Sequence, residues 1–121
     1  MPYRVFVHRL ARRDLKESFK WVARHAPITA MRWLERFEAA ILGLDINPGI
    51  YPLASERKFV AVELREYQFG RYPNVFRILF HIDGDCVRVV RIFRGQRKGL
   101  SRKTILDALH DADVEQNQPE N

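Results

Sequence analysis

Two amphipathic segments separated by a short break constrain the fold of this chain more than any other feature. Apolar residues of the second segment recur at steps of four, three, four and three, which is the period of one face of an α-helix. They are Ala30, Leu34, Phe37, Ile41 and Leu44. The first segment begins near Leu10 and shows a similar period, at Ala11, Leu15, Phe19 and Val22. Pro27 follows it, and a proline disfavours helical conformation in the residue before it. The sequence therefore predicts a helical hairpin whose apolar stripes must be covered by a sheet or another layer.

Alternating apolar residues in the second half of the chain predict a β-hairpin. In the segment FRILFHIDGDCVRVVRIFRGQR, the pair Asp83-Gly84 suits a type I′ turn, which needs positive φ at both central residues. With these two residues at the centre of the turn, Ile82 would pair with Asp85, and the apolar face would pack on the helices. The opposite face would then carry Arg77, His81, Arg88 and Arg94. Arg91 falls on the apolar face, where we expect its stem to pack and its head to reach water.

Two more β-rich runs, residues 3–7 and 59–69, complete an order of strand, helix, helix, strand, strand, strand. We predict an α+β fold in which a small, mostly antiparallel β-sheet packs on the N-terminal helical hairpin. Ser101 is a suitable N-cap for a short C-terminal helix. The expected organisation is one domain over residues 1–100, its helical extension over 101–113 and a flexible tail over 114–121.

Charge is distributed unevenly along the chain. Lysine and arginine total 21, and all of them lie at or before Lys103, whereas five of the 15 acidic residues follow it. Residues 1–106 therefore carry a net charge of +11, and the remaining tail carries −5. A body with this charge attracts polyanions, either nucleic acids or acidic protein partners. The alternative is that the charge reflects only an arginine-rich proteome.

Several classes of protein and site are excluded by what the sequence lacks. Hydrophobic residues make up 46% and charged residues 30%, which is typical of a folded domain rather than a disordered chain. No apolar run approaches membrane length or resembles a signal peptide, so we expect a cytoplasmic protein with no membrane partner. The four histidines are scattered and Cys86 is the single cysteine, so no metal, cofactor or internal disulfide is expected.

The arginine-bearing face of the predicted hairpin has three interpretations. Arginine binds phosphate well because its planar fork donates two hydrogen bonds at once, so the face suits a polyanion. It could instead be the solvated face of an open antiparallel sheet. A third interpretation is metal-free RNA cleavage, in which a 2′-hydroxyl attacks the adjacent phosphate with help from a base, an acid and cations. The cations could come from Arg77, Arg94 and Arg97. His81 is the candidate acid or base, with Glu63 and Glu66 as alternatives.

Several motifs of this chain resemble the RelE/ParE superfamily of toxins from type II toxin-antitoxin (plasmid stabilisation) modules. They are the loop PGIYPL, the segment ELRE, the hairpin FRILFHIDGD and the closing RGQR. The resemblance spans roughly residues 3–98 and implies the family fold, a small antiparallel sheet with a helical hairpin. It also implies a cognate antitoxin, which neutralises the toxin by wrapping an acidic segment over it.

The two branches of the superfamily imply different chemistry. RelE-like members cut messenger RNA on the ribosome, and this chain matches their catalytic set at Arg77 and Arg97. Two expected lysines, however, fall at Ala61 and Glu63, and the expected tyrosine falls near Lys103. A carboxylate in place of a lysine would repel the scissile phosphate. ParE-like members lack that set and block DNA gyrase by binding it, so the resemblance favours a ParE-like gyrase inhibitor.

The resemblance also indicates which residues would carry each function. The expected target- or antitoxin-binding residues are Arg65, Tyr67, Arg77, Arg88, Arg94 and Arg97. The alternative is a RelE-like ribonuclease with the ribosome and messenger RNA as its partners, in which Arg77, Arg97 and His81 would be catalytic. A further alternative is a degenerate member that binds its partner without toxicity.

Overall fold

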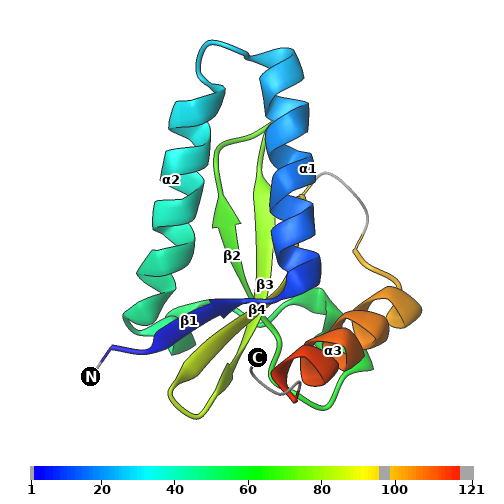
Figure 1. Ribbon diagram of the computed structural model, residues 1–121. Coiled ribbons are helices and arrows are strands. Elements are labelled where there is room, and N and C mark those ends of the chain that lie inside the picture. Colours follow the sequence, from blue (N-terminus) through cyan, green and yellow to red (C-terminus); the bar gives the residue numbers. More distant parts are fainter. Residues whose placement is uncertain (1, 96–98, 118–121) are drawn as a thin grey trace.

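The computed structural model describes residues 2–95 and 99–117, and that part of the chain contains three α-helices and four strands (Figure 1). Their order is β1 (Arg4–Val7), α1 (Arg9–His25), α2 (Ala30–Leu42), β2 (Arg65–Phe69), β3 (Phe76–Asp83), β4 (Cys86–Arg94) and α3 (Arg102–Gln116). Short 3-10 helices lie between α2 and β2: η1 (Gly43–Asp45), η2 (Pro48–Ile50) and η3 (Ser55–Phe59). The predicted α+β class and order of elements are confirmed, including the C-terminal helix.

The four strands form one mixed sheet in the order β1-β4-β3-β2. β3 pairs antiparallel with both β2 and β4, whereas β1 pairs parallel with β4, with Arg4 opposite Cys86 and Val7 opposite Val89. The sheet is therefore mixed instead of mostly antiparallel. The edge strand β1 lies beside β4, the last strand in the chain. The long segment between β1 and β4 crosses over the sheet, so the two strands run in the same direction.

The helical hairpin of α1 and α2 covers one face of the sheet (Figure 1). The stripe predicted for α2 is buried there, since Phe37 and Leu44 are fully enclosed and Ala30 and Ile41 are nearly so. These side chains and those of α1 meet apolar residues of the sheet in one core: Phe76, Ile78, Phe80, Val87, Val89 and Ile92. Burial of each large apolar side chain stabilises the fold by about 1.5–3 kcal/mol. The stripe therefore determines how the hairpin lies on the sheet.

The opposite face of the sheet is covered as well. Here η3 and α3 enclose a second apolar cluster: Ala54, Leu64, Leu79, Val90, Phe93, Leu100, Ile105, Ala108 and Ala112. Ser101 caps α3 as predicted, because its hydroxyl accepts the Thr104 N–H at 3.2 Å. The helix then continues to Gln116, three residues beyond the predicted end. The face expected to be open to solvent or partners is therefore largely covered, because α3 lays its apolar side chains on it.

β2 is shorter than the sequence suggests. It begins at Arg65 instead of residue 59, because residues 55–59 form η3. Leu53 bridges to Arg65, and the Ala54 N–H donates to the Leu64 carbonyl at 2.8 Å. The apolar residues between η3 and β2 therefore serve the second cluster instead of extending the sheet.

The turn of the β-hairpin lies one residue later than predicted. Asp83 pairs with Cys86, so Gly84 and Asp85 occupy the centre of the turn, and the predicted pairing of Ile82 with Asp85 is wrong. Gly84 has a φ of 59°, a left-handed conformation that glycine adopts without steric cost. Gly84 is therefore the first central residue of the turn, instead of the second as predicted.

A β-bulge changes which residues of β4 share a face. Phe80 pairs with Val89, whereas the preceding residue Leu79 pairs with Arg91, so β4 contains one extra residue at this point. Side chains of a strand alternate between faces, and one inserted residue reverses the alternation beyond it. The face predicted for Arg94 is wrong for this reason.

Candidate functional site

Arg77 projects from β3 on the face that η3 and α3 cover, and two carboxylates enclose its guanidinium. Only 8% of the residue is exposed. Its Nη2 donates to Glu56 Oε1 at 2.7 Å, its Nη1 to Glu56 Oε2 at 3.1 Å and its Nε to Glu66 Oε2 at 2.8 Å. The guanidinium carbon also lies 4.8 Å from the centre of the Phe93 ring, a cation–π arrangement. The predicted phosphate- or partner-binding arginine is thus fully engaged inside the protein.

Glu56 is buried even more deeply, at 1% exposed, and its Oε2 also accepts the Leu100 N–H at 2.8 Å. Burial opposes ionisation of this carboxyl. Hydrogen bonds from Arg77, Leu100 and its own backbone outweigh burial and lower the pKa of Glu56 to about 2. Burial likewise opposes the charge of Arg77, but the bonds to Glu56 and Glu66 raise the pKa of Arg77. This charged pair fixes η3 and the segment before α3 to the sheet.

His81 lies on the same strand as Arg77 but far from it. The two are four residues apart on β3, and successive strand residues advance by about 3.3 Å, so their Cα atoms are about 13 Å apart. Burial lowers the pKa of His81, although nearby Asp83 acts in the opposite direction. The structure therefore does not bring the predicted cation and the predicted acid or base together.

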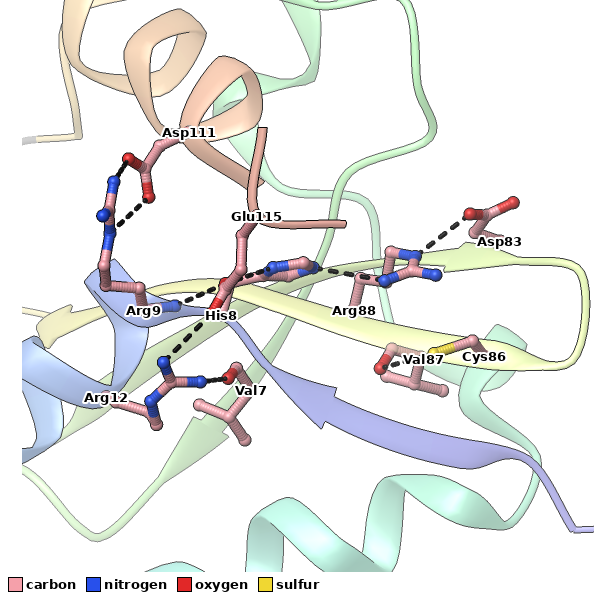
Figure 2. A network of polar contacts seen from close by, with 10 residues as sticks. All are labelled: Val7, His8, Arg9, Arg12, Asp83, Cys86, Val87, Arg88, Asp111 and Glu115. Carbon is pink, nitrogen blue, oxygen red and sulfur yellow. Dashed lines mark hydrogen bonds and ion pairs between the residues drawn. The ribbon is translucent and has the colours of Figure 1, made fainter. Parts of the chain in front are cut away.

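Arg88 joins a polar network at the other end of β3 and β4 (Figure 2). Its Nε donates to Asp83 Oδ2 at 3.0 Å, and its Nη1 lies 3.5 Å from His8 Nε2. His8 is 1% exposed, and its Nδ1 lies 2.8 Å from Glu115 Oε1 of α3. Figure 2 shows the imidazole between Arg88 and Glu115. One buried histidine thus links β4, the start of α1 and the end of α3.

Glu115 anchors α3 to the start of α1 (Figure 2). Besides its contact with His8, it accepts the Arg9 N–H at 2.9 Å and a bond from Arg12 Nη2 at 3.0 Å. The first N–H groups of a helix have no partner within the helix, so a carboxylate is favourable there. Arg9 adds an ion pair with Asp111. Burial opposes the charge of Glu115, but its bonds from Arg9, His8 and Arg12 lower its pKa, whereas burial lowers the pKa of His8.

Arg91 and Arg94 both contact α1, although Arg94 was predicted to lie on the opposite face of the sheet. Arg91 donates two hydrogen bonds to Asp14, at 2.6 and 3.1 Å. Its head was expected to reach water but is instead paired with this carboxylate. The same carboxylate accepts the Ile92 N–H at 2.9 Å. Arg94 lies over the Trp21 ring, with its guanidinium carbon 3.9 Å from the ring centre. The bulge explains the position of Arg94, because it reverses the alternation of side chains in the part of β4 that contains Arg94.

The other predicted binding residues do not complete a cluster. Tyr67 stands opposite Ile78, whose side chain points to the helices, and it packs edge-to-face on Tyr51 with ring centres 5.1 Å apart. Arg65 donates to the Tyr51 carbonyl at 2.8 Å and to Glu63 at 3.1 Å. Arg97 lies outside the described residues. The structure thus distributes the predicted residues over both faces of the sheet.

The chemistry open to this region is that of fixed ion pairs. Within residues 2–95 and 99–117, no three His, Cys, Asp or Glu side chains are grouped so that they could hold a metal ion. The helices of the same two ranges include none with the length and apolar character needed to cross a membrane. Arg77 is paired with both Glu56 and Glu66, and Glu115 is paired with Arg12 and contacts His8.

The fold and the sequence motifs together point to one family. A family model described as the ParE toxin of the type II toxin-antitoxin system parDE matches residues 5–99, most of the chain. This chain belongs to the ParE toxin family. It is a toxin of the type II toxin-antitoxin class, and the resemblance to the RelE/ParE superfamily is confirmed. The matched residues end before α3, which begins at Arg102.

A solved structure shares the fold of this ParE-family toxin. This structure, titled as the chromosomal ParDE toxin-antitoxin system from P. aeruginosa, has a TM-score of 0.63 at 20% identity and covers 76% of this chain and 95% of that chain. Another is a mutant of the E. coli toxin RelE in the free state, with a TM-score of 0.47 at 12% identity, covering 98% of this chain and 100% of that chain. No match was found among curated proteins.

The sequence of this ParE-family chain does not identify Glu56 or Glu115, and it indicates Glu66 only as an alternative acid or base. Arg77 itself is the usable signal, because an arginine inside an apolar strand is rarely buried without a partner. The partner is not readable from the sequence, since Glu56 lies 21 residues away from Arg77 and Glu115 lies 107 residues away from His8. Only the folded chain brings these groups together.

Proposed function

We propose that this toxin is a ParE-like inhibitor of DNA gyrase, which binds the enzyme in the cytoplasm and is neutralised there by a cognate antitoxin. The state of Arg77 is the observation that supports this most. In a RelE-like ribonuclease this arginine would have to hold the scissile phosphate. Here Glu56 and Glu66 occupy its donors, so it has little capacity left for a phosphate.

A phosphate would have to replace these carboxylates or approach beside them, and both are unfavourable. Replacement would leave Glu56 charged and unpaired in the interior, at a cost of about 3–5 kcal/mol. Approach beside them would place the phosphate near two like charges, each repelling it by about 4 kcal/mol at 4 Å and an effective dielectric constant of about 20. Phosphate chemistry at Arg77 is therefore disfavoured.

The predicted acid or base is also too far from Arg77 to take part in catalysis there. A general acid or base has to lie within hydrogen-bond reach of the reacting group. His81, about 13 Å from Arg77 along β3, does not meet that condition for a phosphate held at Arg77. Inhibition by binding requires only a complementary surface, which a basic toxin can present.

Charge supports an acidic antitoxin as the neutralising partner. The +11 of residues 1–106 favours an acidic segment laid over the toxin, because complementary charge speeds and orients association. Among the predicted contacts, the partly exposed ones are Arg65, Tyr67, Arg88 and Arg94. We retain them, with Arg97, as proposed contacts with the antitoxin or the target.

The test is a gyrase assay with purified toxin and plasmid DNA. We expect micromolar toxin to inhibit supercoiling and to trap cleaved DNA, and the product of a small acidic reading frame beside the gene to reverse both effects. Absence of inhibition at micromolar toxin would refute the gyrase proposal. A parallel reaction with ribosomes and messenger RNA should give no cleavage in the A site. Cleavage that Arg97→Ala abolishes would favour the ribonuclease alternative, and inactivity in both assays would favour a degenerate member.

A further inference from the structure

A groove is lined by α2, the edge strand β2 and the loop after it, away from the ion-pair clusters described above. Figure 1 shows α2 and β2 on the same side of the molecule. We call it the α2–β2 groove, and its volume is about 880 Å³. Its exposed polar lining consists of Thr29, Arg32, Arg36, Gln68, Arg71 and Asn74. None of the described residues that line it carries a carboxylate.

The three arginines of this groove differ from those of the site described above. Arg32 and Arg36 are four residues apart on α2, so they lie on one face of the helix about 6 Å apart along its axis. Arg71 faces them from the loop after β2. Over the ranges that the structure describes, none of the three forms an ion pair, whereas Arg77, Arg88 and Arg91 are each held by a carboxylate. Three uncompensated positive charges therefore line one groove.

The backbone of the loop after β2 fixes the position of Arg71 in the groove. Gly70 has a φ of 94°, and a Cβ at this position would lie 2.6 Å from the Asn74 carbonyl oxygen. The Asn74 N–H closes the loop by donating to the Arg71 carbonyl at 2.8 Å. Because only glycine fits this close approach, the loop has a defined conformation that places Arg71 and Asn74 at the rim.

The neighbouring backbone disfavours an added protein strand as the occupant. Recognition by strand addition depends on main-chain hydrogen bonds along a free sheet edge. The first half of the β2 edge is already occupied, since Leu53 bridges to Arg65 and the Glu66 N–H donates to the Pro52 carbonyl at 2.9 Å. Only the three strand residues 67–69 remain for main-chain pairing at this edge, so recognition in the groove depends mainly on side chains. Guanidinium and amide side chains are the groups that contact DNA phosphates and sugars.

We propose that the α2–β2 groove binds the phosphate backbone of DNA through Arg32, Arg36 and Arg71. The inference rests on the proposed function for its setting, because the substrate of gyrase is DNA. A toxin that contacts both gyrase and DNA stabilises the complex in which both are present, which is the cleaved complex expected above. Binding through the backbone requires no particular base sequence.

Binding of the full-length toxin to a fluorescent 20-base-pair duplex, without gyrase, tests this inference independently of the proposed function. The informative variant is Arg32→Ala with Arg36→Ala. The matched control is Arg13→Ala with Arg102→Ala, which removes the same charge from exposed positions outside the groove. All four side chains are exposed, and circular dichroism should confirm that both variants fold like the wild type.

We expect the groove variant to bind at least about tenfold more weakly at 100 mM salt, and the slope of log K against log salt concentration to fall by about 1.8. The control should change affinity by less than about twofold, and two unrelated duplex sequences should bind equally. Equal losses in both variants, or no binding by the wild type, would overturn the proposal. It would also be overturned if a glutamate-rich peptide bound in an Arg32- and Arg36-dependent way while DNA did not, because the groove would then receive a protein. Loss of gyrase inhibition with DNA binding intact would refute only the proposed function.

Discussion

Replacing Glu56 with glutamine is expected to destabilise the protein by about 3–5 kcal/mol, because it removes the main counter-charge of a buried arginine. The carboxylate accepts bonds from Arg77 at 2.7 and 3.1 Å and from the Leu100 N–H at 2.8 Å. Glutamine keeps one acceptor oxygen, but its NH₂ group would face a guanidinium donor or the Leu100 N–H. Glu66 still pairs with Arg77 in the variant, which places the expected loss toward the lower end of this range.

Denaturant unfolding at pH 7 measures this loss, and thermal unfolding should show a decrease in Tm of about 10–20 °C. The matched control is Glu63→Gln. Glu63 also pairs with an arginine, Arg65 at 3.1 Å, but its side chain is 79% exposed, so its replacement should cost less than about 1 kcal/mol. If Glu56→Gln unfolds within 1 kcal/mol of the wild type, the assignment of a structural role to the Arg77 cluster is refuted.

The pH dependence of stability provides a second readout of the same group. The pKa of Glu56 is about 2 in the folded protein and 4.5 in its ordinary state, so the unfolded chain binds this proton more readily. The stability contributed by Glu56 is therefore present above pH 4.5 and is lost as the pH falls toward 2. Glu56→Gln should flatten the decline of unfolding free energy over this interval, and an unchanged curve would contradict the lowered pKa.

Two further substitutions and one titration test other parts of the structure. Phe37→Ala should cost about 3–5 kcal/mol in denaturant unfolding, because it empties a fully enclosed position between α2 and the sheet, and a loss below 1 kcal/mol would contradict that packing. Gly70→Ala should cost about 1–3 kcal/mol, since φ is 94° and the added Cβ would lie 2.6 Å from the Asn74 carbonyl oxygen, and wild-type stability would contradict this geometry. NMR titration should give His8 and His81 pKa values below 6.5, because burial lowers both, so stability should fall as the pH drops through and below 6.5; values above 6.5 would contradict the burial of these rings.

Much of the fold could be predicted because its signals are local. The period of Phe37, Ile41 and Leu44 identifies a helix and its buried face from residues within three or four positions of one another. Ser101 identifies the start of α3 in the same way, through a hydroxyl and an N–H only three residues apart. Pairing in the β-hairpin could not be predicted to the residue, because the apolar alternation reveals neither which residues centre the turn nor the extra residue in β4.

The candidate site was less predictable than the fold. The sequence singles out Arg77, His81 and Arg88 as polar residues within a strand pair, because charge inside an apolar run is visible directly. It does not show that Arg77 is neutralised by Glu56 or that Arg94 lies over Trp21 of α1. Those contacts join segments that are far apart in the sequence, and their spacing along the chain does not indicate that they lie close in space.

By itself, the sequence determined the class of fold, the two amphipathic helices, the strand pair and the basic charge of the body, since each follows from composition or from the period of neighbouring residues. Tertiary structure alone decided that β1 joins β4 in parallel, that α3 covers the second face, and that Arg77 is buried between carboxylates. The physical reason is that burial and ion pairing depend on which surfaces meet, and a buried charge finds its partner only when distant segments have closed around it.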